Sequence, residues 1–311
     1  MISTTLPARR ISMTPAQRIV LLLGVPATLA LVVWTGYSIV ASTAQGSYTD
    51  GYTEAVTGTQ LTLNVDNGMV SNVNVEGGAA TGSVKLSQTV TYGLVRPDLQ
   101  PALNVTRGVS GTSIDFGCQQ WNNCDVNALA AVRPQTAVTV STNGGNATVG
   151  DLAAPVSAST NSGNLTASNL TDGGTLSSGG GNITATAVSG STTMLSGGGQ
   201  VYADQITGNL EMSSQGGNIQ ANGLATPDLS VDSGGGFVAL TMTQAPANLQ
   251  VDAEGGNVTI ILPPGGTRYD VRVDAQGDNS PNGTIASTVP SSPTSKNVIT
   301  VNSGGGDVTI S

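Results

Sequence analysis

Carboxylates are the side chains in this sequence whose type and spacing could support acid–base or metal chemistry. The 311-residue chain contains no histidine, and no lysine or arginine occurs between Arg133 and Arg268. Asp232 and Asp252 each follow an apolar valine in two similar segments, so we expect them to stack on neighbouring strands with Glu254 nearby. Like charges this close repel unless they are screened or share a cation. Three interpretations follow: solvated surface acids, a weak calcium site, or a catalytic carboxylate pair.

Hydroxyl side chains form a second regular pattern. Thr148, Thr166 and Thr184 recur every 18 residues, with Ser168 and Thr186 beside them. A flat threonine array can bind ice or a sugar surface, although threonine is also an ordinary strand residue. The array therefore predicts a strand face first and a binding surface second.

Several familiar site motifs are incomplete in this chain. The glycine runs lack the Lys-Ser/Thr of a P-loop, and only Asp307 stands where calcium-binding nonapeptide repeats need an aspartate in every repeat. Asn-x-Thr, a glycan acceptor in some hosts, fits a turn asparagine followed by a strand threonine. In the repeat, the asparagines that begin this motif after a glycine pair are Asn146, Asn164, Asn182 and Asn257. The sequence thus assigns no catalytic, cofactor-binding or metal-binding residue.

The chain has two cysteines, Cys118 and Cys124, in the segment CQQWNNC. Their number and spacing exclude a redox CxxC motif and a four-ligand zinc site. In an exported domain, a local disulfide that closes a short loop is expected.

A repeat of about 18 residues must position all these side chains. The residue after each glycine pair falls in one column, with steps of 18 to 20 residues: Asn146, Asn164, Asn182, Gln200, Asn218, Phe237 and Asn257. Two apolar columns follow at the next and third positions, beginning at Ala147 and Val149. A third precedes the glycines: Val140, Ala158, Leu176, Met194, Met212, Val231 and Val251. These columns predict two inward-facing strands in each repeat.

Eighteen residues are too few for a strand with a crossover helix, so the repeat predicts an all-β parallel β-solenoid. We expect the glycines to mark a corner, because they allow positive φ and a close approach of stacked backbones. Stacked asparagines at that corner can bond to neighbouring coils.

The flanks extend the same domain. LTLNVDNGMVSNVNVEG from Leu61 has alternating strands around a turn, and SGGGDVTI from Ser303 repeats the signature. The Pro/Ser-rich segment from Ser280 is expected to be a loop that interrupts the solenoid. The predicted solenoid domain covers residues 55–311, after a linker over 42–54.

The N-terminus predicts a membrane anchor. Residues 19–41 form an uncharged apolar run that is long enough, as a helix, to cross a bilayer. Arg9, Arg10 and Arg18 precede it, which favours a cytoplasmic segment 1–18 and export of the remainder. Cleavage as a signal peptide near Ser42 and Ala44 is the alternative.

Composition narrows the function further. The chain has 42 glycines, 3% aromatic and 9% charged residues, and a formal charge of −9. Eight acids and no bases occur between Arg133 and Arg268, which excludes a nucleic-acid partner.

The glycine coils and the closing VNSGGGDVTIS resemble a bacterial adhesin-like family, exported repeat proteins of unknown function. The segment VDAEGGNVTIILPPGGTRYDVRV adds to the likeness, which covers roughly residues 55–311. The resemblance implies a β-solenoid, often on a membrane anchor, and no catalytic residues.

Together these features predict a single-pass membrane protein that presents a non-enzymatic solenoid outside the cell, for adhesion, interaction or envelope structure. Envelope polysaccharide or a surface protein is the expected partner. A carbohydrate-active enzyme and a self-assembling scaffold are the alternatives.

Overall fold

The computed structural model describes residues 46–66, 71–92, 101–118, 124–276 and 283–311. All regular secondary structure in these residues is β-strand, and none of them belongs to a helix long and apolar enough to cross a membrane. The predicted cytoplasmic segment 1–18 and membrane helix 19–41 lie outside the described residues.

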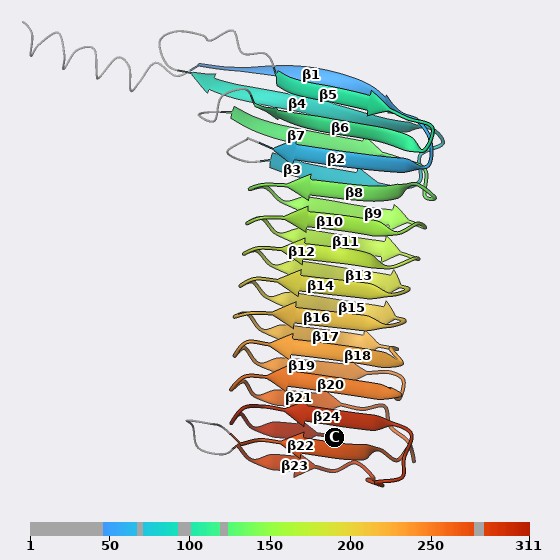
Figure 1. Ribbon diagram of the computed structural model, residues 1–311, viewed down its shortest axis with the longest axis vertical. Coiled ribbons are helices and arrows are strands. Elements are labelled where there is room, and N and C mark those ends of the chain that lie inside the picture. The colour runs from blue at the N-terminus through green and yellow to red at the C-terminus, as the bar shows by residue number, and fades with distance from the viewer. Residues whose placement is uncertain (1–45, 67–70, 93–100, 119–123, 277–282) are drawn as a thin grey trace, which may run out of the picture. The chain divides into compact units, whose positions relative to one another are not determined.

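The strands are numbered β1 to β25 in chain order (Figure 1). Their bounds are β1 Gly46–Val56, β2 Gln60–Asp66, β3 Ser71–Glu76, β4 Gly82–Tyr92, β5 Pro101–Arg107, β6 Gly111–Cys118, β7 Cys124–Ala131, β8 Ala137–Thr142, β9 Ala147–Leu152, β10 Val156–Thr160, β11 Leu165–Leu170, β12 Gly174–Ser178, β13 Ile183–Ser189, β14 Thr192–Ser196, β15 Val201–Thr207, β16 Leu210–Ser214, β17 Ile219–Leu224, β18 Asp228–Ser233, β19 Val238–Met242, β20 Asn248–Ala253, β21 Val258–Ile261, β22 Asp270–Asp274, β23 Ile285–Ser287, β24 Val298–Asn302 and β25 Val308–Ile310.

The chain divides into two compact units. The larger comprises Tyr48–Val90 and Leu99–Ser311, and it contains the coils, their core and the groove described below. The smaller comprises Met1–Ser47 and Thr91–Asp98, of which the structure describes only the ends of β1 and β4.

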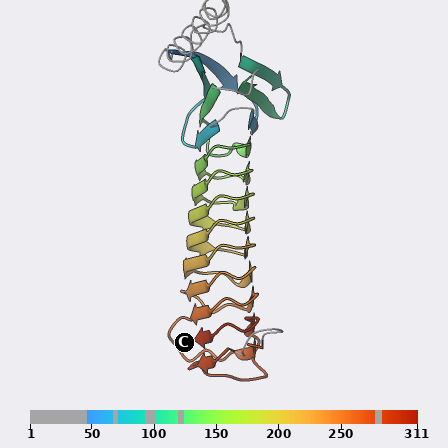
Figure 2. The ribbon, with the colours of Figure 1, turned by 90° about the vertical axis from the view of Figure 1, so that its left-hand side faces the viewer.

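The larger unit contains the predicted parallel solenoid. From β8 to β21, even-numbered strands belong to a 12-stranded sheet (sheet B) and odd-numbered strands to a 13-stranded sheet (sheet A). Every neighbouring pair in this central stack is parallel, and the pairs are in register, for example Ser159 with Ser141 and Ser177, except for one register shift between β17 and β19. Figure 2 shows the two sheets of these coils facing each other as two layers. Each coil therefore places one strand in each sheet, as the repeat predicts.

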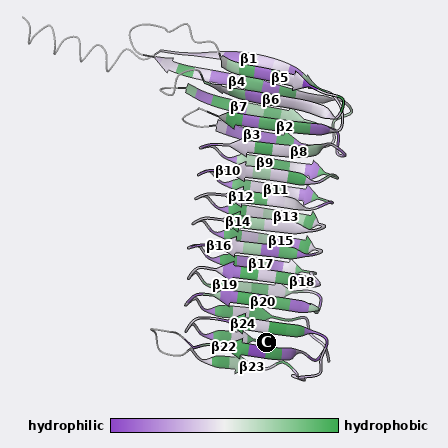
Figure 3. Cartoon of the chain, in the orientation of Figure 1, coloured by the Kyte–Doolittle hydropathy of each residue, from purple (hydrophilic) through white to green (hydrophobic). Residues whose placement is uncertain are grey.

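The core lies between the two sheets. All three predicted apolar columns are buried, and Leu176, Ile183 and Ala185 of one coil are fully shielded from solvent. Inward and outward residues alternate along the strands, which gives the alternating colours of Figure 3. A fourth inward column was not predicted from the sequence. It comprises Leu152, Leu170, Val188, Ile206 and Leu224.

A backbone bulge explains why the fourth column escaped the period-two pattern. The residue before each of its first four members has a positive φ of 53° to 57°. This left-handed residue adds one position before the next side chain turns inward. The bulge column comprises Asp151, Asn169, Ala187 and Gln205, followed by Gly223 at φ 64°.

The glycine corner confirms close backbone approach as a reason for glycine in the central coils, and positive φ as a reason in the C-terminal coils, at Gly235 and Gly255. A Cβ on Gly181 would lie 2.1 Å from the carbonyl oxygen of Gly163 in the preceding coil, so close backbone approach requires glycine. Gly181 does not have the positive φ that was expected, and neither does Gly163. The middle glycine of the same cluster, Gly180, would meet nothing within 4 Å if it carried a Cβ. In the preceding coil that position is Ser162.

Buried hydroxyl groups form hydrogen bonds that link the glycine corner of each coil to that of the preceding coil. The Gly181 N–H donates to Ser178 Oγ at 2.8 Å, and the same hydroxyl donates to the Gly163 carbonyl at 2.9 Å. Ser196 and Ser214 bridge successive coils in the same way. Each hydroxyl therefore satisfies one backbone donor and one backbone acceptor that would otherwise be buried without a partner.

The predicted asparagine ladder is present beside these hydroxyls. Asn146 Oδ1 accepts from the Asn164 N–H at 2.9 Å, and Asn164 Oδ1 accepts from the Asn182 N–H at 2.9 Å. Toward the C-terminus, Asn257 Oδ1 accepts from the Asp307 N–H at 2.9 Å, and Asp307 Oδ1 accepts from the Thr284 N–H at 2.8 Å. The asparagine column is therefore structural.

Both ends of the stack depart from sequence order. The β2–β3 coil lies between the β6–β7 coil and the β8–β9 coil, and β24–β25 lies between β20–β21 and β22–β23. At the N-terminal end, β4 pairs antiparallel with β7 and β5 pairs antiparallel with β6. Alternating parallel coils therefore give way to antiparallel strands at this end.

Two segments expected to be irregular carry strands. β1 begins at Gly46, inside the segment 42–54 predicted as a linker, because alternating Tyr, Thr and Val residues favour a strand. The Pro/Ser-rich segment from Ser280 contains β23, which pairs with β25 and completes an end coil. That segment is therefore part of the solenoid rather than a simple interruption.

Candidate ligand-binding groove

A row of polar side chains crosses five neighbouring strands on the outer face of sheet B. Its members face one another in register: Asp115 on β6, Asn64 on β2, Ser141 on β8, Ser159 on β10 and Ser177 on β12. The residues before and after each of them point into the core, so the row points outward. Parallel strands about 4.8 Å apart present one polar group per step.

This row forms part of the lining of a groove of about 780 Å³, which we call the sheet B groove. Several of its other lining residues lie where the strands meet the glycine corner. Asn143 and Asn161 are among them, and Asn161 Nδ2 lies 3.4 Å from Asn143 Oδ1. Ala102 on β5 and Gly117 on β6 line it at the N-terminal end. The groove therefore spans six consecutive strands of sheet B, from β5 to β12 in the spatial order.

Hydrogen bonds already orient part of the lining. Asn64 Nδ2 donates to Asp115 Oδ1 at 2.6 Å, which fixes the amide and the carboxylate against each other. The Asp115 carboxylate is the one charged side chain of the lining. The groove thus combines hydroxyls, amides and a single negative charge with the apolar lining residues Val65, Ala102 and Phe116.

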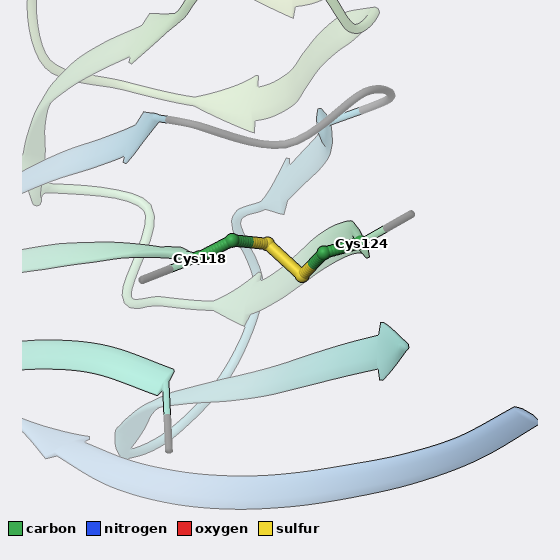
Figure 4. Close-up of a disulfide and its surroundings, with 2 residues drawn as sticks. All are labelled: Cys118 and Cys124. Atoms are coloured by element: carbon green, nitrogen blue, oxygen red, sulfur yellow. A yellow bond between two sulfur atoms is a disulfide. The ribbon is translucent and has the colours of Figure 1, made fainter. Parts of the chain in front are cut away.

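The predicted disulfide is present and lies next to this groove. Cys118 ends β6 and Cys124 begins β7, and their sulfurs are bonded (Figure 4). Gly117, which lines the groove, immediately precedes Cys118. The disulfide therefore links β6, the strand that forms the N-terminal part of the groove, to β7.

The acids that suggested chemistry come together only as a pair. Asp232 and Asp252 are in register on β18 and β20, as predicted. Asn302 of the inserted coil follows Asp252 in the same row, and its Nδ2 donates to Asp252 Oδ1 at 3.2 Å. Within the described residues, no group of three or more His, Cys, Asp or Glu side chains could hold a metal ion.

The threonine array exists but is short. Thr148, Thr166 and Thr184 are in register on the outer face of sheet A, and Tyr202 is the next member of that row. Ser168 and Thr186 form part of a parallel row. Tyr202 limits the flat hydroxyl surface to three coils, which is little area for an ice or sugar surface.

A smaller hollow of about 340 Å³ lies on sheet A near the N-terminal coils. Asn72, Asn74, Asn127 and Asn146 line it together with Leu129, whose side chain is 56% exposed. All four asparagines already bond within the hollow or to the asparagine ladder. Its amides therefore have structural roles, and it lacks the row of serine hydroxyls that lines the sheet B groove.

One carboxylate of the described chain has a shifted pKa. Asp307 accepts hydrogen bonds from the Thr284 backbone N–H and the Thr284 hydroxyl, both at 2.8 Å. These bonds favour the charged form and lower the pKa of Asp307, the backbone bond having the larger effect. Asp307 is part of the asparagine ladder and lies outside the groove.

Sequence reasoning missed the sheet B groove because three of its strands pair out of sequence order. Ser141, Ser159 and Ser177 recur every 18 residues and could have been found as an outward column. Asn64 and Asp115 carry no such signal, since β2 and β6 join the row only through long-range pairing.

A family model described as Toastrack DUF4097 matches residues 134–311. No curated protein matches the chain. A provisionally named cell adhesion protein from Clostridium sporogenes ATCC 15579 is 12% identical over 85% of this chain and 99% of its own, with a TM-score of 0.28. A provisionally named adhesin from Parabacteroides merdae ATCC 43184 is 11% identical to this chain, with a TM-score of 0.30. The match covers 87% of this chain and 98% of the adhesin. Likeness at these TM-scores supports no conclusion about this chain.

Proposed function

The chain belongs to the Toastrack DUF4097 family, and we propose that it is a membrane-anchored, extracytoplasmic binding module. The family match confirms the resemblance to an adhesin-like family of unknown function that the repeat suggested. The sheet B groove carries this proposal. It is large enough for a ligand, lined by hydrogen-bonding side chains and built on rigid strands. A solenoid that presents such a face outside the cell suits adhesion to envelope polysaccharide or a surface protein.

A non-enzymatic role is part of the proposal. The chain has no histidine, and the coils between Arg133 and Arg268 have no lysine or arginine to serve as a general acid or a charge stabiliser. Among the described coils, Asp232 and Asp252 form a stacked acid pair that could act without a basic partner. Its neighbour Asn302 occupies one carboxylate oxygen with a hydrogen bond.

A binding screen tests the proposal. The full-length chain in detergent is applied to an array of glycans and cell-envelope polymers, with and without calcium, and the bound polymers are recovered and sized. We expect reproducible retention of at least one polymer at unchanged length. Retention of none would refute a binding role, and shortening that disappears in an Asp232→Asn, Asp252→Asn variant would establish an enzyme instead.

The anchor is tested separately by fractionating cells that express the full chain. We expect the protein to stay in the membrane after an alkaline wash and to retain its N-terminus. A soluble product that begins near residue 45 would contradict an uncleaved anchor and support a signal peptide.

A further inference from the structure

We propose that the sheet B groove binds a neutral, linear oligosaccharide, with the row from Asp115 to Ser177 as its floor. This proposal rests on the binding function proposed above and names both the site and the chemical class of its ligand. The argument comes from the shape, the hydrogen-bonding groups and the charge of the groove.

The floor matches a chain of hydroxyl groups in both spacing and chemistry. One polar side chain stands on each strand, about 4.8 Å from the next. Serine hydroxyls donate and accept, amides do both through separate atoms, and a carboxylate accepts only. Because Asp115 Oδ1 is taken by Asn64, its second oxygen is left to accept from a ligand hydroxyl. Sugar hydroxyls, which also donate and accept, can pair with such a surface along its whole length.

Charge selects against anionic polymers. The lining contains one carboxylate and no cationic side chain. A phosphate- or carboxylate-bearing polymer would meet Asp115 without a compensating lysine or arginine, and like charges across an interface are unfavourable. A neutral ligand avoids that repulsion.

The limits of the groove agree with the limits of the small polar row. Beyond Ser177 the next member of the row is Leu195, whose larger side chain is 37% exposed. Farther along the same face the row contains the acids Asp232 and Asp252. The hollow thus ends where Leu195 interrupts the row of small polar side chains. Across six strands it extends roughly 24 Å, which accommodates several sugar rings in line.

The probe must be a polymer rather than a single sugar. The side chains of the floor offer hydrogen bonds that also form with water, so we expect each sugar to contribute weakly. A repeating polymer multiplies these contacts and raises the local ligand concentration. Neutral probes are dextran, mannan and cello-oligosaccharides, and anionic probes are polygalacturonate and poly(glycerol phosphate).

The test compares two substitutions in one column of sheet B. Ser159→Trp fills the groove, whereas Ser213→Trp places the same side chain on the same face outside it. Both positions are half-buried, and Leu195 shows that this column accepts a large side chain. Asp115→Asn serves as a second variant that preserves shape, with Asp232→Asn as its control.

We expect the full-length chain to bind at least one neutral polymer with an affinity that changes less than twofold between 50 and 500 mM salt. Ser159→Trp should weaken this binding at least tenfold and Asp115→Asn severalfold, while both controls stay within twofold. Equal effects of Ser159→Trp and Ser213→Trp would refute the groove and leave the binding function intact. Salt-sensitive binding to the anionic polymers alone would refute a neutral ligand, and absence of any binding would refute both proposals.

Discussion

The central coils and the two ends of the stack use the same corner chemistry with different chain paths. From β8 to β21, each coil stacks on the coil that follows it in sequence. At the ends, β2–β3 lies between two coils that come later in the chain, and β24–β25 lies between the preceding β22–β23 and the earlier coil β20–β21. The asparagine ladder nevertheless continues from Asn257 through Asp307 to Thr284. The corner groups therefore act through spatial stacking and do not require sequence neighbours.

The two ends also differ in how they stop the stack. The N-terminal end finishes with strands that run antiparallel to their neighbours. At the C-terminal end, β22 is short and carries Asp270, Arg272 and Asp274, and the backbone of Tyr269 bonds to Pro290 and Ser292 of a proline-containing loop. Short, charged and loop-covered edges discourage pairing with another chain. This arrangement disfavours edge-to-edge pairing with another chain at the C-terminal end.

The largest expected effect comes from the corner of the central stack. Gly181→Ala places a Cβ against the Gly163 carbonyl, so the coils must separate, and we expect a loss of about 3 kcal/mol in the free energy of unfolding. Gly180→Ala meets no atom and should change it by less than about 0.5 kcal/mol. Denaturant unfolding of both variants measures the difference. Equal losses would show that close approach is not the reason for glycine.

The next effect concerns the N-terminal end. Replacing Cys118 and Cys124 together by alanine removes the constraint on a short loop, which should reduce stability by about 2 kcal/mol. Because repeat proteins lose structure locally, hydrogen exchange should accelerate in β6 and β7 and remain unchanged from β14 onward. Uniform acceleration along the stack would contradict a local role for the disulfide.

A smaller loss is expected from the corner hydroxyls. Ser196→Ala leaves the Gly199 N–H and the Gly181 carbonyl without their side-chain partner, which should lower stability by about 1 to 2 kcal/mol. The column naturally holds alanine at Ala253, where the Gly256 N–H bonds to the backbone carbonyl instead. Ala253→Ser should therefore have little effect. A loss at Ala253 as large as that at Ser196 would argue against the hydroxyl bridge.

Relief of backbone strain should stabilise the central stack slightly. Ala187 has φ 54°, a conformation unfavourable for a residue with a Cβ, so Ala187→Gly should raise the melting temperature and add about 0.5 to 1 kcal/mol. Ala185→Gly, two residues earlier in the core, should have the opposite sign. Destabilisation by both substitutions would contradict the bulge.

The smallest effect is a pH dependence at the C-terminal end. Hydrogen bonds from Thr284 lower the pKa of Asp307 in the folded chain, so its stabilising contribution is present above the unfolded pKa of about 4. That contribution is lost as the pH falls through the lower folded value. We expect acid titration of the melting temperature to be shallower in Asp307→Asn. An unchanged slope would show that the bonds form equally with the neutral acid.

The repeat made the central stack predictable from the sequence, because glycine, asparagine and apolar residues recur at one period. The bulge was not predictable, since Asp151, Asn169, Ala187 and Gln205 share no side-chain chemistry and are alike only in φ. The inserted coils were missed for a different reason. Nothing in the local sequence of β2 distinguishes pairing with β6 and β8 from pairing with its sequence neighbours, because long-range pairing decides the register. The sheet B groove depends on that pairing, and so it emerged only from the structure.

Disulfide cross-linking of paired cysteines would test most directly whether β2 lies between β6 and β8 and so completes the groove floor. The three variants are Asn64→Cys with Asp115→Cys, Asn64→Cys with Ser141→Cys, and Asp115→Cys with Ser141→Cys, each compared with the parent chain. Register neighbours on adjacent strands lie within disulfide reach, whereas strands two steps apart do not. We expect the first two pairs to cross-link under mild oxidation and the third to remain reduced. Efficient cross-linking of the third pair, with none through Asn64, would place β6 directly beside β8 and contradict the groove.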